Sequence, residues 1–158
     1  MTTAAAATSA LYSSYFHEAH AAMRAVVTGA GTSVLDWRPG DATNSIAVLV
    51  AHAIEAERAI TSEVAGLTLS RDRDAMFRVS GLGTDELVAM IDATERDVDG
   101  FLAAVTDDRL AAAIDRRGRT ETGARWLLHV ASHTREHIGQ ATLTRQLAEQ
   151  AVTIGREA

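Results

Sequence analysis

Residues 122–147 read TGARWLLHVASHTREHIGQATLTRQL, and the rest of the chain is organised around this stretch. Its apolar and histidine positions recur at helical spacing and so share one face of one helix: Trp126, Val130, His133, His137, Ala141 and Thr144. His133 and His137 are four residues apart, so their imidazoles project from that face one turn apart. Two imidazoles in this register can bind one divalent metal ion, although such a pair is more often an ordinary surface or core feature. Because both lie on the core stripe, each needs a polar partner, which a metal ion would supply.

Three further segments show helical periodicity, and they predict the fold class. Together with the last segment, the predicted helices cover residues 8–27, 44–66, 84–105 and 122–147. The connections 67–83 and 106–122 carry no helical period and are expected to be loops. With a single proline in the chain, these four segments predict an all-α protein that forms a four-helix bundle.

Composition sets limits on the function. A chain of 158 residues suits one domain spanning residues 1–158. The net charge of -6, without a basic cluster, makes nucleic acid an unsuitable partner. The absence of cysteine excludes thiolate ligands, so any metal must be held by His, Asp or Glu. We expect a cytoplasmic protein with no membrane span, because no apolar run approaches 18 residues and no signal peptide begins the chain. All basic residues are arginine and alanine is abundant, which indicates a GC-rich bacterial genome.

One histidine of the second predicted helix completes a candidate metal site. His52 follows the same stripe as Leu49 and Ala56, so it belongs on or beside the core face. Helices in a bundle pack about 8–10 Å apart, so one imidazole can meet an i, i+4 pair on the facing helix. Three imidazoles leave a coordination position open, as catalytic sites do. We expect a divalent ion on His52, His133 and His137, with zinc or nickel foremost and iron or manganese left open.

Other polar residues are weaker candidates. Arg116, Arg117 and Arg119 directly precede the last helix and could hold an anionic group of a substrate or cofactor, although an exposed basic loop is the commoner meaning. His20 lies near the apolar stripe of the first helix and is expected at the edge of the core. His129 is eight residues from His137, about 12 Å along a helix axis, so we do not expect it to share the metal.

The motifs resemble those of a known family. The string HxxxHxGQ at residues 133–140, with the later RQL at 145–147, resembles the signature of the DinB/YfiT superfamily. WRPG at 37–40, followed by NSIAVLVAHAIEAE at 44–57, is similar to that family's loop and second helix. The match extends over roughly residues 11–147. The resemblance implies a DinB-like four-helix bundle of up-down-down-up topology with a divalent metal on His52, His133 and His137.

The resemblance also suggests a function. Members of known activity include bacillithiol S-transferases and mycothiol-dependent maleylpyruvate isomerase. It therefore implies a metal-dependent enzyme that acts on a small-molecule substrate with a low-molecular-weight thiol, as a transferase or an isomerase. Because the protein has no cysteine, the thiol would be a co-substrate. The GC-rich genome that the arginine and alanine content indicates favours mycothiol over bacillithiol.

Two alternatives remain open at this level. The first is a metal-dependent hydrolase, with Glu55, Glu57 or Glu136 as candidate general base. The second is a non-enzymatic, stress-related binding bundle whose metal is structural. For assembly, we expect a homodimer, because aromatic side chains concentrate in interfaces and three lie together at residues 12–16. A bundle core would account for the same aromatic residues.

Overall fold

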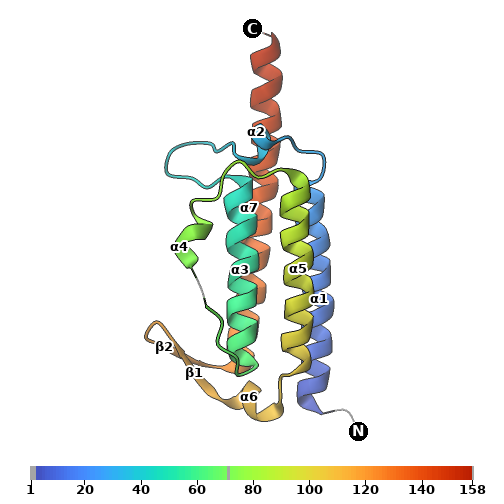
Figure 1. Cartoon of the computed structure of the whole chain (residues 1–158), viewed down its shortest axis with the longest axis vertical. Coiled ribbons are helices and arrows are strands. Elements are labelled where there is room, and N and C mark those ends of the chain that lie inside the picture. The colour runs from blue at the N-terminus through green and yellow to red at the C-terminus, as the bar shows by residue number, and fades with distance from the viewer. Residues whose placement is uncertain (1–2, 71, 158) are drawn as a thin grey trace.

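Four long helices form the body of the protein. The computed structural model describes residues 3–70 and 72–157, with side chains described as far as Ala151. The long helices are α1 (Ala4–Val27), α3 (Ile46–Val64), α5 (Thr84–Ala103) and α7 (Gly123–Glu157). In Figure 1, α1 and α7 run one way and α3 and α5 run the other, with the connection from α3 to α5 crossing the length of the bundle. The predicted four-helix bundle of up-down-down-up topology is confirmed.

Short elements occupy the connections, two of which were predicted as loops. They are the helices α2 (Thr32–Leu35), α4 (Arg73–Met76) and α6 (Asp107–Ala111) and the strands β1 (Ala113–Arg116) and β2 (Arg119–Thr122). The two strands form an antiparallel hairpin in which Arg116 pairs with Arg119. Its turn residues, Arg117 and Gly118, have φ of 58° and 78°, which is the left-handed geometry of a two-residue hairpin turn. The prediction of a loop over 106–122 was wrong because this hairpin depends on distant contacts.

Those contacts bind the hairpin to the bundle. Ile114 of β1 is buried in the core, and its carbonyl accepts a hydrogen bond of 2.9 Å from the indole nitrogen of Trp126 on α7. The four-residue strands are too short to show a period of two against the surrounding polar residues. The hairpin therefore forms because α7 provides a surface for it.

Local signals set most helix ends. The Ser45 hydroxyl accepts a hydrogen bond from the amide of Val48, which caps α3 one residue after the predicted position. At the start of α5, the Glu86 carboxylate accepts a hydrogen bond from the backbone N–H of Gly83. The first helix begins at Ala4 rather than residue 8, because an alanine run continues it back to its cap at Thr3.

Among the residues with described side chains, the core divides into two hydrophobic clusters, one toward each end of the bundle. One cluster includes Met23, Ile54, Ile91 and Ala141, and the other includes Phe16, Ile60, Val98 and Ala131. Between these positions, each long helix contributes one fully or almost fully buried polar residue: His20, Glu57, Thr94 and Thr134. His20 is 0% exposed, so its predicted place at the edge of the core was wrong. A buried polar layer therefore crosses the middle of the bundle.

The aromatic residues of α1 pack within the bundle. Phe16 is fully buried, and the Tyr15 hydroxyl donates a hydrogen bond of 3.1 Å to the carbonyl of Ala131 on α7. Tyr12 packs, partly buried, against the cluster that contains Phe16. These contacts account for the aromatic residues without an interface, so the homodimer stays a prediction.

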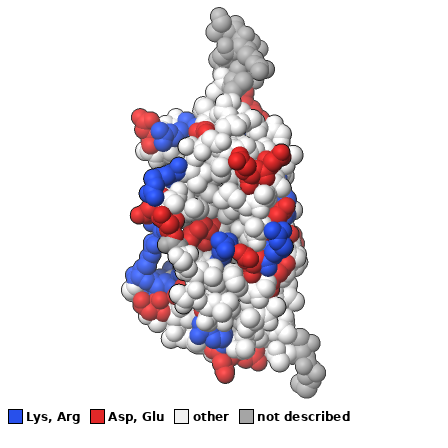
Figure 2. Space-filling view, in the orientation of Figure 1, with Lys and Arg blue, Asp and Glu red and all other residues white. Residues whose placement is uncertain are grey.

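The outer surface carries mixed charge. Figure 2 shows arginines and acidic side chains interspersed over the face in view. Within the described residues, no helix combines the length and apolar character needed to cross a membrane.

Candidate metal centre

The structure brings the three predicted histidines together where α3 packs against α7. The ring centroid of His52 lies 5.1 Å from that of His133 and 5.0 Å from that of His137. The Nε2 atoms of His133 and His137 are 3.1 Å apart. One ligand nitrogen from each ring lies within 4.8 Å of the other two.

These distances suit one metal ion. A tetrahedral ion with metal–nitrogen bonds of about 2.1 Å holds its donor atoms about 3.4 Å apart. The 3.1 Å pair on α7 is close to that separation, and a small movement of the His52 ring would complete it. Among the described residues, the cluster of potential ligands contains these three imidazoles and no carboxylate. The three histidines could therefore bind a metal ion with a position left for water or substrate.

A glutamine one turn away orients one of the rings. His137 Nδ1 lies 2.8 Å from Gln140 Oε1, and the Gln140 amide nitrogen lies 3.4 Å from a Glu136 carboxylate oxygen. With the amide held in this sense, the hydrogen bond places the proton on Nδ1 of a neutral His137. The Nε2 lone pair then faces the other histidines, as a metal ligand requires. The sequence string contained Gln140 but did not indicate this role.

The site lies at the side of the bundle. His52 is 8% exposed, and the Phe77 ring, which follows α4, lies 4.7 Å from it. The Arg73 guanidinium lies 5.1 Å from the centroid of the Phe77 ring. His133 and His137 are only partly buried, so the expectation of two core imidazoles was wrong for them. The triad is therefore partly accessible to solvent, which suits a site that exchanges ligands.

His129 lies beside the triad without belonging to it. Its ring centroid is 6.2 Å from that of His133 and 5.4 Å from that of Trp126. Burial lowers the pKa of His129, and the positive charges of Arg119 and Arg116 lower it further. Two arginines therefore bring positive charge close to this side of the triad.

The three predicted arginines have different surroundings. Arg116 forms an ion pair with Glu63, and its guanidinium lies 5.5 Å from the Trp126 ring. Arg119 lies 5.2 Å from the same ring, and it pairs with a glutamate of its own strand while remaining 50% exposed. Arg117 is exposed at the tip of the hairpin. Of the three, Arg119 combines exposure with closeness to the aromatic side chains that lead to the triad.

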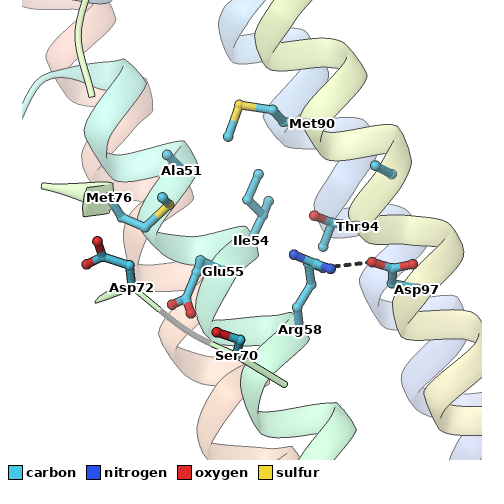
Figure 3. A pocket seen from close by; sticks show the side chains of 11 residues that line it. Ala51, Ile54, Glu55, Arg58, Ser70, Asp72, Met76, Met90, Thr94 and Asp97 are labelled. Carbon is cyan, nitrogen blue, oxygen red and sulfur yellow. Dashed lines mark hydrogen bonds and ion pairs between the residues drawn. The ribbon is translucent and has the colours of Figure 1, made fainter. Parts of the chain in front are cut away.

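A separate cavity of about 370 Å³ lies between α3 and α5 (Figure 3). Apolar side chains and an ion pair of 2.7 Å between Arg58 and Asp97 line it. Glu55 also lines this cavity, whereas none of the three triad histidines does. Glu55 therefore lies on a different face of α3 from the triad histidine His52.

The sequence defines the family. The family model of the DinB superfamily matches residues 15–141, and the chain belongs to that superfamily. No curated protein sequence matches it.

Solved structures share the fold. A conserved protein from Enterococcus faecalis aligns with a TM-score of 0.74 at 15% identity, over 89% of this chain and 96% of that one. A DinB-like protein from Bacillus subtilis aligns with a TM-score of 0.69 at 16% identity, over 86% and 90%. A DinB-like protein from Bacillus cereus aligns with a TM-score of 0.71 at 13% identity, over 87% and 91%.

Proposed function

We propose that this protein is a metal-dependent enzyme that uses a low-molecular-weight thiol, as a transferase or an isomerase. The observation that carries the proposal is the convergence of three imidazoles without a carboxylate among the described ligand candidates, in a chain that has no cysteine. A bound divalent ion with an open position would lower the pKa of a thiol and hold it as a thiolate. Membership of the superfamily is compatible with this chemistry, although a fold does not determine a reaction.

The donor set also guides the choice of metal and thiol. Three neutral imidazoles suit zinc or nickel, and we propose one of these as the native ion. The GC-rich genome that the amino-acid composition indicates favours mycothiol as the thiol. In a transfer reaction, the thiolate would form a carbon–sulfur bond with the electrophile, and the leaving group would depart with the bonding electrons.

The arginines beside the triad support an anionic reactant. Burial lowers the pKa of His129, and the nearby charges of Arg119 and Arg116 lower it further; its ring is 6.2 Å from that of His133. A carboxylate on the thiol or on the electrophile would be attracted to this side of the site. Arg119 is the residue we assign to that contact, because its side chain is 50% exposed whereas that of Arg116 is 14% exposed.

The positions of the carboxylates make a metal-dependent hydrolase the second choice. Glu57 is fully buried, and both its oxygens take part in hydrogen bonds with other core side chains. Glu55 lines the separate cavity, and Glu136 contacts the amide of Gln140. A structural metal is the third choice, because structural sites are closed by four protein ligands whereas this cluster offers three.

The test compares metal-loaded protein with an aryl halide electrophile, in the presence and absence of candidate thiols. We expect turnover only with thiol, and its loss in His52→Ala. His17→Ala is the matched control, since His17 is an exposed histidine of α1 paired with Asp99. Turnover of an ester without thiol would instead favour the hydrolase. No turnover in either assay, with a metal released only on unfolding, would favour the structural role.

A further inference from the structure

A continuous path of hydrogen bonds crosses all four long helices at the polar layer. On α1, His20 Nε2 lies 2.6 Å from Glu57 Oε2 of α3, and both side chains are 0% exposed. The second oxygen of Glu57 accepts a hydrogen bond of 2.7 Å from the Thr134 hydroxyl of α7. The other ring nitrogen of His20, Nδ1, lies 3.2 Å from Glu95 Oε2 of α5. One histidine therefore connects the helices through two carboxylates.

The path reaches solvent at one end only. Glu95 Oε2 also accepts a hydrogen bond of 3.1 Å from Arg24, and Arg24 forms an ion pair of 2.6 Å with Asp92. The side chains of Arg24 and Asp92 are 28% and 43% exposed. At the other end, Thr134 is 0% exposed. The path is therefore open to proton exchange with solvent on the α5 side, where these side chains are partly exposed, and its α7 end is buried.

The number of protons on His20 follows from its neighbours. A carboxylate only accepts hydrogen bonds, and a neutral imidazole has one N–H. With carboxylate oxygens against both ring nitrogens, a neutral His20 would leave a nitrogen lone pair facing an oxygen. An imidazolium donates to both, and such charge-assisted hydrogen bonds are stronger than neutral ones.

We propose that His20 is a proton-operated clamp, whose imidazolium form holds α1, α3, α5 and α7 together at the polar layer. Loss of one proton from the ring would break one of its two carboxylate contacts and loosen that layer. Thr134, at the α7 end of the path, directly follows His133, so the clamp acts beside the metal-binding candidates. Both ring nitrogens of His20 contact carboxylates, Glu57 through Nε2 and Glu95 through Nδ1, so its protons bond to these acids.

The charges around His20 determine the direction of the pH effect. Burial lowers the pKa of His20, but the hydrogen bonds and negative charges of Glu57 and Glu95 more than offset this, and the pKa is raised above 6.5. Arg24 is the charged neighbour on α1, and Thr134 of α7 does not titrate. A raised pKa means that the folded state binds the proton more tightly than the unfolded state. The stabilisation is therefore fully present below about pH 6.5 and disappears as the pH rises through the folded-state pKa.

The first test follows thermal unfolding of the full chain in chelator from pH 6 to pH 10. At pH 6 we expect His20→Gln to unfold roughly 10 °C below the wild type, as for one missing partner of a buried ion pair. The difference in unfolding temperature between the two proteins should narrow as the pH rises, because the wild type then loses the ring proton that the variant never carries. His17→Gln is the matched control, a histidine of the same helix paired with Asp99 at 2.8 Å but 49% exposed. It should change the midpoint by less than about 2 °C at every pH.

A second measurement on the wild type stands even if His20→Gln does not fold. The ¹⁵N chemical shifts of the His20 ring, assigned through the backbone, should show both nitrogens protonated at pH 7. A neutral ring at that pH, with the proton on Glu57 instead, would overturn the proposal. A difference in unfolding temperature between wild type and His20→Gln that stays constant from pH 6 to pH 10 would also overturn it.

Discussion

Replacing Gln140 with alanine should weaken metal binding without weakening the fold. Gln140 Oε1 lies 2.8 Å from His137 Nδ1, and this contact keeps the Nε2 lone pair directed at the triad. Loss of such an orienting partner reduces metal affinity by about 10–100-fold. That range corresponds to roughly 1.4–2.7 kcal/mol of binding free energy.

The cost to folding should be small, because Gln140 is an exposed residue of α7. Alanine is a better helix former than glutamine, and exposed substitutions change the free energy of unfolding by about 0.5 kcal/mol or less. Metal affinity and stability can therefore be separated in one variant. Gln140→Glu supplies a carboxylate acceptor for the same Nδ1 proton, and it should keep the affinity within a few-fold of wild type.

The assay is a competition titration of zinc between the protein and a chromogenic chelator, with thermal unfolding of the metal-free protein measured in parallel. Gln146→Ala is the matched control, since Gln146 is exposed on the same helix beyond the triad. It should bind zinc as the wild type does. Wild-type affinity in Gln140→Ala, within about twofold, would refute the reasoning that this glutamine sets the His137 tautomer.

Three other substitutions and two conditions give further tests. His133→Ala should lose bound metal in elemental analysis, whereas His129→Ala should retain about one ion per chain, because that ring lies outside the cluster of ligand atoms. Zinc affinity should fall as the pH drops below about 6.5, since ligand imidazoles must be neutral, and a flat titration from pH 5 to pH 8 would contradict imidazole ligation. Gly123→Ala should lower the free energy of unfolding by about 1–3 kcal/mol in denaturant titrations, because its added Cβ would collide with the Arg109 carbonyl. Light scattering at high micromolar concentration tests the homodimer, and a monomeric mass there would exclude it.

Local periodicity was sufficient to predict the four long helices and to indicate that three histidines form a candidate metal site. His133 and His137 share a face of α7 because residues four apart on any helix do so. His52 follows the core stripe of α3, and bundle packing brings such a stripe against the facing helix. The motif HxxxHxGQ added the superfamily, which the family match over residues 15–141 bears out. These features depend on residues close together in the chain or on packing rules common to all bundles.

Only the tertiary structure decided which polar residues meet inside the bundle. Glu57 lies 37 positions from His20 and 77 from Thr134 in the chain, so no local pattern relates them. The hairpin likewise needs the indole of Trp126, which lies outside both strands. His20 alone reads as an ordinary histidine at the edge of an apolar stripe. In the folded protein it is a buried ring with a carboxylate in hydrogen-bonding distance of each nitrogen. Folding removes water from the ring, so both nitrogens need these polar partners.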